Sequence, residues 1–257
     1  MVPVHFAGQP TNQEEIRDLS DEYGFYVLED ASHAIGASRN NEPVGSCRWS
    51  DITVFSFHPV KIITTGEGGM AMTNDADLAE RMALFRTHGI TRDADRFVNV
   101  PPGPWYYEQQ LLGFNYRMTD IQAALGISQL ERLDVYVERR NMLAERYRRT
   151  LRDLPLYLPI VIHGNRSAFH LYVARLKCDE IGKSHQQVFV HMRHQGIGVN
   201  LHYMPVHLQP YYRDLGFKEG QFLEAEKHGK EALTLPLYPK MSEHEQDEVI
   251  CSLQDIL

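Results

Sequence analysis

Residues 51–75 read DITVFSFHPVKIITTGEGGMAMTND and place a single lysine, Lys61, between two short apolar runs. Residues 52–57 are rich in β-branched and aromatic side chains, which predicts a buried strand. Gly68 and Gly69, followed by residues 70–73, predict a turn into a second strand. Lys61 is therefore expected in a loop at the end of a strand.

Loops at strand ends carry chemistry in α/β proteins because a rigid sheet holds them in place. A lysine held there among apolar neighbours can lose its proton and act as an amine nucleophile. The alternative is a solvated loop lysine. The residues around Lys61 in the sequence must distinguish a nucleophilic lysine from a solvated one.

An acidic pair lies upstream, after residues 25–28, which read FYVL and predict another buried strand. Glu29 and Asp30 follow at its carboxyl end, where open α/β sheets bind ligands. A carboxylate there can pair with a protonated ring nitrogen, as a pyridoxal phosphate enzyme requires to keep its ring an electron sink. Asp30 is the candidate for that role.

Three segments together resemble the DegT/DnrJ/EryC1/StrS family of sugar aminotransferases. They read EDASHAIGA (residues 29–37), SFHPVK (residues 56–61) and TGEGG (residues 65–69), in the order of the family signature. The resemblance implies pyridoxal 5'-phosphate as the cofactor and gives four residues a role: Lys61 forms the Schiff base and moves the proton, Asp30 pairs with the ring nitrogen, Ser56 binds the phosphate and His33 binds the phenolic oxygen. A sugar dehydratase on the same fold is disfavoured, because such relatives replace the lysine with histidine.

The resemblance also implies the fold. We expect a three-layer α/β large domain of the fold type I aminotransferases, truncated at its amino end, in residues 1–135, and a smaller α+β domain in residues 136–257. Thr119 and Gln122 form a capping box that opens a long amphipathic helix. In the family, a helix like this leads from the large domain into the small one.

Asn115 lies just before that helix, in the segment GFNYRM of residues 113–118. In the family this asparagine reaches the active site of the neighbouring subunit. The resemblance therefore implies a homodimer with shared sites, in which Asn115 contacts cofactor and substrate. On the sequence alone, Asn115 could equally be a loop residue that bonds its own backbone.

The substrate is implied by residues 200–207, which read NLHYMPVH and resemble the family segment that closes over a sugar nucleotide. The substrate-binding candidates are Ser56, Asn115, Asn200, Leu201, His202 and Tyr203. Residues 3–8 (PVHFAG) and 86–90 (RTHGI) look most like the family branch that serves pseudaminic acid synthesis. That branch implies transfer of an amino group from glutamate to a UDP-linked 4-keto-6-deoxy sugar.

Further elements are predicted from periodicity and capping residues. The predicted strands are residues 2–6, 170–176 and 199–203. One helix is predicted after Pro10, and two more cover residues 76–87 and 138–151. A fourth helix is capped by Ser184 and ends at Gly196, and a fifth is capped by Ser242.

Composition narrows the class of protein. The 257 residues are 43% hydrophobic and 23% charged, which is ordinary for a globular protein, and the net charge of −8 argues against general nucleic-acid binding. No apolar run reaches the roughly 18 residues of a membrane span, and no signal peptide is visible, so we expect a cytoplasmic protein. The three cysteines lack CxxC spacing and are expected to be reduced.

Residues 185–207 are rich in histidine, and His191 and His194 lie three residues apart on a predicted helix. They could bring two metal ligands together. No carboxylate or cysteine supplies a convincing third ligand, so we expect no metal site.

The family carries a further amino-terminal segment with a phosphate-binding turn, which nothing in these residues matches. We therefore expect the chain alone to bind pyridoxal phosphate weakly or not at all, since Ser56 is a single hydroxyl donor for the phosphate. One alternative belongs to a different functional class. In it, the chain is a non-catalytic binding or assembly subunit that kept the family core.

Overall fold

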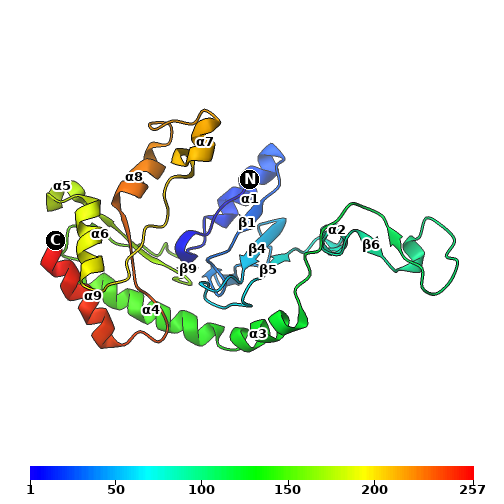
Figure 1. Ribbon diagram of the computed structural model, residues 1–257, viewed down its shortest axis with the longest axis horizontal. Coiled ribbons are helices and arrows are strands. Elements are labelled where there is room, and N and C mark those ends of the chain that lie inside the picture. The colour runs from blue at the N-terminus through cyan, green and yellow to red at the C-terminus, as the bar shows by residue number, and fades with distance from the viewer.

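The computed structural model describes residues 1–257 and has an α/β architecture of two packed lobes and a projecting arm (Figure 1). Ten buried apolar residues form the core of the first lobe, and nineteen form the core of the second. None of the helices is both long and apolar enough to cross a lipid bilayer.

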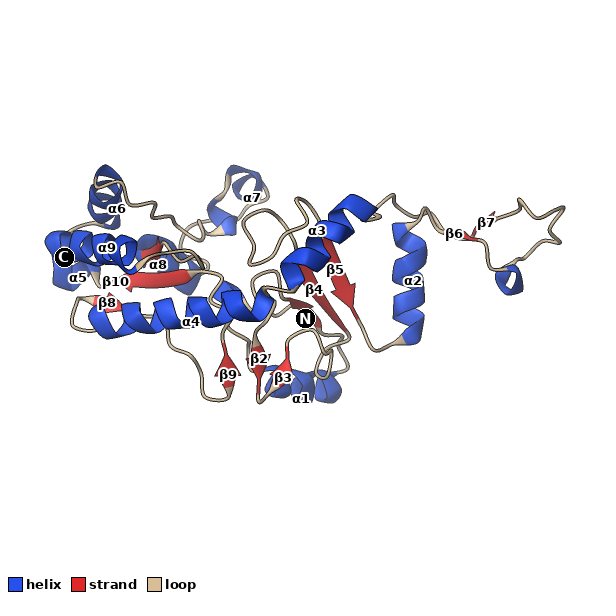
Figure 2. Ribbon diagram, turned by 90° about the horizontal axis from the view of Figure 1, so that it is seen from below, coloured by secondary structure: helices blue, strands red, loops and turns tan.

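The first lobe is built on a sheet in the order β1 (Leu28–Asp30), β4 (Ile52–Ser56), β5 (Gly69–Met72). Strands β1 and β4 are parallel, whereas β4 and β5 are antiparallel. The sheet lies between α1 (Gln13–Tyr23) and α3 (Asp120–Leu130) (Figures 1 and 2). The predictions for residues 52–57 and 70–73 are thus confirmed, and Lys61 lies in the connection between β4 and β5.

Two strand predictions at the amino end need correction. Strand β1 begins only at Leu28, so Glu29 and Asp30 belong to the strand and do not follow it. The preceding Tyr26 is 80% exposed, because the chain leaves the left-handed cap at Gly24 before it joins the ladder. Residues 2–6 contribute a single bridge, between Val4 and Asp30, and not a full strand.

The arm leaves the first lobe after α2 (Ala76–Arg86). It contains a short hairpin of β6 (Ile90–Thr91) and β7 (Glu108–Gln109), with the 3-10 turn η2 (Ala94–Arg96) between them. The rest of residues 87–117 forms irregular connections.

Helices α3 and α4 (Leu133–Thr150) connect the lobes. The capping box of Thr119 and Gln122 is confirmed, but the long helix predicted after it breaks at residues 131–132. In α4, Val137 belongs to the first core, whereas Leu143 and Tyr147 belong to the second. One rigid helix therefore serves both cores, and the boundary at residues 135–136 stays a prediction.

The second lobe has an antiparallel sheet in the order β11 (Ala232–Leu235), β10 (Tyr172–Leu176), β8 (Leu156–Tyr157). The Ser184 cap of α6 (His185–His194) and the Ser242 cap of α9 (Glu243–Ile256) are confirmed, and each forms a capping box. The strand predicted at residues 199–203 is wrong, since only Asn200 forms a bridge, to Thr234. The remaining elements of this lobe are α5 (Cys178–Ile181), η3 (Val206–Leu208), α7 (Pro210–Asp214) and α8 (Leu223–Glu231).

A small sheet of β2 (Ser38–Arg39), β3 (Glu42–Pro43) and β9 (Asn165–Arg166) joins residues far apart in the sequence. The turn η1 (Phe6–Gly8) adds a second junction, because Ala168 donates to the Gly8 carbonyl and Leu171 to the Ala7 carbonyl. These junctions bring the two lobes together beside the carboxyl end of β1.

Candidate active site

The loop that carries Lys61 is held from both sides. The Phe57 carbonyl accepts hydrogen bonds from the Thr64 hydroxyl (2.9 Å) and the Thr65 amide (3.1 Å), and the Lys61 amide donates to the His58 carbonyl (2.9 Å). The next residues, Ile62 and Ile63, are buried in the first core. The Lys61 side chain therefore projects from a fixed backbone, although it is itself half-buried.

Asp30 is fixed by backbone hydrogen bonds to residues 3–5 and by a bond from the Ser32 amide to its side chain. Its carbonyl accepts from the His5 amide (3.0 Å), its amide donates to the Pro3 carbonyl (2.9 Å), and its Oδ1 accepts from the Ser32 amide (3.0 Å). Burial lowers the pKa of Lys61, and the negative charge of Asp30 acts against this lowering. The charges of Lys61 and Asp30 thus interact. Because burial has the larger effect, the Lys61 amine loses its proton more easily than a solvated lysine does.

His33 is held in one tautomer. The Ala7 amide donates to its Nδ1 (3.3 Å), so a neutral His33 carries its proton on Nε2. That Nε2 lies 3.4 Å from the Tyr203 hydroxyl, across the junction between the lobes. Burial, followed by the positive charge of Lys61, lowers the pKa of His33 to about 4, so the ring is a neutral hydrogen-bond donor at physiological pH.

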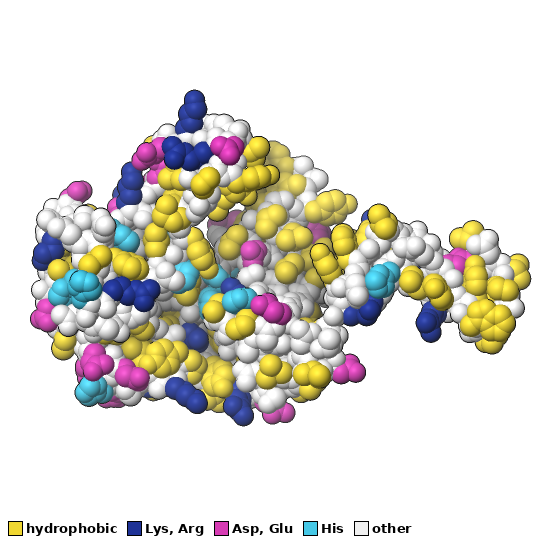
Figure 3. Space-filling view, viewed as in Figure 1, with side chains coloured by type: hydrophobic (Ala, Val, Ile, Leu, Met, Phe, Trp, Pro, Cys, Tyr) yellow, Lys and Arg dark blue, Asp and Glu magenta, His cyan; other side chains and the backbone are white.

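The second lobe contributes His202 and Tyr203. The His202 Nδ1 lies 2.8 Å from the Thr234 hydroxyl, and the His228 Nε2–H donates to the His202 carbonyl (2.9 Å). Burial and the charge of Lys61 lower the pKa of His202, while burial and the charge of Asp30 raise that of Tyr203. Figure 3 shows histidine side chains gathered at the centre of this face, between the lobes.

Two residues at the site were missed in the sequence. His170 is buried, its ring centroid lies 4.5 Å from that of His33, and its Nδ1 has no hydrogen-bond partner. Phe6 lies against His33 and Tyr203, with ring centroids 6.0 and 6.5 Å away. The one sequence signal for them is an aromatic residue beside small residues, in HFAG (residues 5–8) and SAFH (residues 167–170).

No hydrogen bond joins the other candidates to the side chains of this cluster. Ser56 ends β4, and its hydroxyl accepts from the His58 amide (3.4 Å). Asn200 is exposed, and its Oδ1 accepts from the Leu201 amide. Asn115 pairs with Thr87 at the base of the arm, and no hydrogen bond joins it to the residues around Lys61.

The site therefore unites Asp30, His33 and Lys61 of the first lobe with His202 and Tyr203 of the second. An amine with a lowered pKa, a carboxylate at the sheet edge and an imidazole N–H donor are the groups that a pyridoxal ring requires. The residues present thus fit pyridoxal phosphate. Histidine, cysteine, aspartate and glutamate form no group of three that could hold a metal ion.

The sequence matches the model of the DegT/DnrJ/EryC1/StrS aminotransferase family over residues 1–254. A relative in Bacillus subtilis, the spore coat polysaccharide biosynthesis protein SpsC, is 38% identical over 261 aligned residues. The match covers all of this chain and 66% of the relative, so the chain spans just under two thirds of that relative's length.

Solved structures agree with this match. Helicobacter pylori PseC, an aminotransferase of pseudoaminic acid biosynthesis, superposes with a TM-score of 0.89 at 29% identity, over 99% of this chain and 66% of PseC. DesV of S. venezuelae, solved with a ketimine intermediate, superposes with a TM-score of 0.87 at 30% identity, over 99% of this chain and 64% of DesV. The expected fold type I aminotransferase architecture is thereby confirmed.

Proposed function

Because the chain belongs to the DegT/DnrJ/EryC1/StrS aminotransferase family, whose members depend on pyridoxal phosphate, we propose that it transfers an amino group from glutamate to the 4-keto carbon of a nucleotide-linked 4-keto-6-deoxy sugar. The convergence of Lys61, Asp30 and His33 at one sheet edge carries the proposal. The substrate class is supported by the likeness to PseC, an aminotransferase involved in pseudoaminic acid biosynthesis. A UDP-linked sugar of the pseudaminic acid type is the proposed substrate.

Each residue has a task that follows from its surroundings. Lys61, with its lowered pKa, would supply the free amine that holds the cofactor and would carry the proton during amino transfer. Asp30 would provide the anion that keeps a ring nitrogen of the cofactor protonated, and the Nε2–H of His33 would donate to its phenolic oxygen. Pyridoxal phosphate supplies the electron sink when it is bound.

The second lobe closes the site. His202 and Tyr203 lie opposite Lys61 and Asp30, on a segment that Thr234 and His228 fix. We assign Asn200, Leu201, His202 and Tyr203 to the sugar nucleotide, and Ser56 to the phosphate of the cofactor and to the substrate. Asn115 is assigned to the site of a second copy of the chain, which makes the protein a homodimer with shared sites.

The test has two stages. The purified protein is first titrated with pyridoxal phosphate while the visible absorbance of the bound cofactor is followed, with Lys61→Ala as the control. It is then given glutamate and a UDP-linked 4-keto-6-deoxy sugar, and the amino sugar is detected by mass spectrometry. Lysine-dependent absorbance with amino sugar formation supports the proposal. Absence of both would favour the non-catalytic binding or assembly subunit.

A further inference from the structure

Glu29, the residue before Asp30 on β1, is buried with 1% of its surface exposed. Successive side chains of a strand point to opposite faces, so Glu29 faces away from the site that Asp30 faces. Its Oε1 accepts from the Gln13 side chain, and its Oε2 accepts from the hydroxyls of Thr53 (2.7 Å) and Ser50 (3.1 Å). These partners come from the start of α1, from β4 and from the loop before β4.

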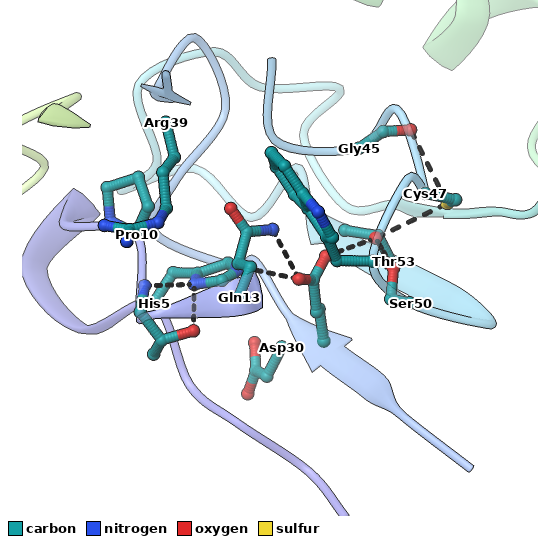
Figure 4. Close-up of polar contacts among 12 residues, drawn as sticks. His5, Pro10, Gln13, Asp30, Arg39, Gly45, Cys47, Ser50 and Thr53 are labelled. Atoms are coloured by element: carbon teal, nitrogen blue, oxygen red, sulfur yellow. Dashed lines mark hydrogen bonds and ion pairs between the residues drawn. The ribbon is translucent and has the colours of Figure 1, made fainter. Parts of the chain in front are cut away.

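His5 completes the surroundings of this carboxylate. The Thr11 amide donates to His5 Nδ1 (3.1 Å), so a neutral His5 carries its proton on Nε2, which lies 3.6 Å from Glu29 Oε1. Figure 4 shows His5, Gln13, Ser50 and Thr53 gathered on one side of β1, and no dashed line reaches Asp30. Burial opposes the ionisation of Glu29, but the hydrogen bonds outweigh it and hold its pKa below the usual value.

The residues that surround Glu29 also pair with strand β1 through the backbone. Thr53 is the residue directly opposite Glu29 in the parallel ladder, and His5 donates its amide to the Asp30 carbonyl. Strand β1 has only three residues, so its ladder alone specifies the register weakly. A slip of one residue would turn Asp30 away from the site and would bring Glu29 to the Lys61 side. Such a slip would also remove a buried carboxylate from all its donors, which is costly.

We propose that Glu29 is a positioning residue for the transamination: its buried carboxylate fixes the register of β1 between residues 3–5 and β4, so that Asp30 faces Lys61. This inference rests on the proposed function, because it gives Asp30 and Lys61 their catalytic meaning. Its test uses the pKa of Lys61, which can be measured without cofactor or substrate.

The measurement is the pH dependence of Lys61 acetylation in the cofactor-free protein, followed by peptide mass spectrometry, since only the deprotonated amine reacts. Besides Asp30, the titratable groups around Lys61 are His33, His170, His202 and Tyr203. Burial lowers the pKa of the three histidines and raises that of Tyr203, so all four are neutral near pH 8. The Asp30→Asn variant gives the shift expected when the charge of Asp30 is lost completely. Because Asp30 raises the pKa of Lys61, its loss should lower the midpoint of acetylation by about 1 pH unit.

Glu29→Gln should lower the same midpoint by roughly half as much, because Asp30 is no longer held toward Lys61. Thr53→Val and Gln13→Leu keep the charge of Glu29 and remove only one donor each, so they loosen the hold on β1 without a full slip. A shift in these variants separates positioning from a direct effect of that charge. They also provide the answer if Glu29→Gln does not fold. Gln246→Leu, which removes a buried hydrogen bond to the Leu143 carbonyl in the second lobe, is the matched control and should leave the midpoint unchanged.

An unshifted midpoint in folded Glu29→Gln, Thr53→Val and Gln13→Leu, alongside a shifted Asp30→Asn, would overturn the inference. An equal shift in Gln246→Leu would do the same, because it would reveal general loosening. Neither result touches the proposed function, which fails separately if pyridoxal phosphate does not load onto Lys61.

Discussion

At the scale of single residues, the site contains one carboxylate among several neutral imidazole rings. Asp30 is the carboxylate beside Lys61, and burial holds His33, His170 and His202 in their neutral forms. Neutral imidazoles donate or accept hydrogen bonds without adding positive charge beside the amine. Lys61 loses its proton more easily because it is partly buried, and Asp30 is the carboxylate beside it that a pyridine ring can use.

Lys61→Ala should abolish the lysine-dependent absorbance with pyridoxal phosphate and lower amino sugar formation at least about 1,000-fold, since both the Schiff base and the proton carrier are lost. The free energy of unfolding should change by less than about 1 kcal/mol, because the side chain is only half-buried in a loop. Urea denaturation and steady-state turnover measure the two effects. Lys61→Arg, which keeps the charge, should be equally inactive, and wild-type turnover in either variant would refute the role of Lys61.

His33 should make stability depend on pH. Its pKa is about 4 in the folded protein and about 6.5 when unfolded, so its contribution is complete above pH 6.5 and is lost as the pH falls toward 4. Between pH 7 and pH 5 this amounts to a loss of about 2 kcal/mol. His33→Asn keeps an acceptor for the Ala7 amide but does not titrate, so urea unfolding at both pH values should show a smaller loss. A loss equal to that of the wild type would contradict the assignment.

The sequence motifs identified those residues of the site that stand in contiguous segments. Asp30, His33 and Lys61 were found because each lies inside a motif whose chemistry is recognisable. His170 and Phe6 were not found, since their importance comes from contacts with His33 and Tyr203 across the lobes, and spacing along the chain does not encode such contacts.

At the scale of elements, local signals succeeded where the local chain decides the structure. The capping boxes of α3, α6 and α9 depend on four consecutive residues, and all three are formed. Strands failed where a partner was needed: Pro3 has no amide proton to donate, and the segment after Asn200 turns away at Pro205 after one bridge. The existence of β11 was missed because its pairing with β10 is set by distant residues.

The turn η1 is the element on which the junction of the lobes depends most directly. Gly8 has a φ of +99°, and a Cβ atom there would lie 2.8 Å from the Phe169 amide nitrogen, 3.0 Å from that of His170 and 3.1 Å from the His33 carbonyl oxygen. Backbone atoms cannot move aside individually. The turn therefore accepts glycine alone at this position.

Gly8→Ala should lower the free energy of unfolding by about 3 kcal/mol and weaken cofactor binding, because His33 and His170 would be displaced with the turn. Gly24→Ala is the control: it has a similar left-handed backbone, with φ of +70°, but no atom within 4 Å of the new Cβ. It should cost only about 1 kcal/mol and leave cofactor binding unchanged. Urea unfolding and a pyridoxal phosphate titration compare the two, and equal effects would show that the close contacts of Gly8 carry no weight.

At the scale of the whole molecule, the arm of residues 87–117 stands clear of both lobes (Figure 1). It exposes large apolar side chains, among them Val100 and Trp105, which are 91% and 74% exposed. Glu108 orders its loop by accepting from the amides of Val98 and Asn99, and these bonds lower its pKa to about 2. An ordered apolar projection is typical of a segment that packs on another chain.

If Asn115 serves the site of a second copy, two inactive variants should restore each other. Lys61→Ala and Asn115→Ala are each expected to be inactive, but a mixed dimer has one site that carries neither change. Random pairing should return about a quarter of wild-type activity. Turnover is measured after the two proteins are produced together, with each variant alone as the control. No recovery in a mixture shown to contain mixed dimers would exclude sharing of the sites.

The hydrogen-bonded pair of His33 and Tyr203 spans 170 positions of the chain, and this separation has a consequence for biosynthesis. At ribosomal speeds of roughly 5–20 residues per second, about 10 to 30 s pass between the emergence of these two residues. During that interval the first lobe can already fold, while the half of the site that faces it has not yet been translated. The two halves of the site therefore meet only late in synthesis, because they are far apart in the sequence.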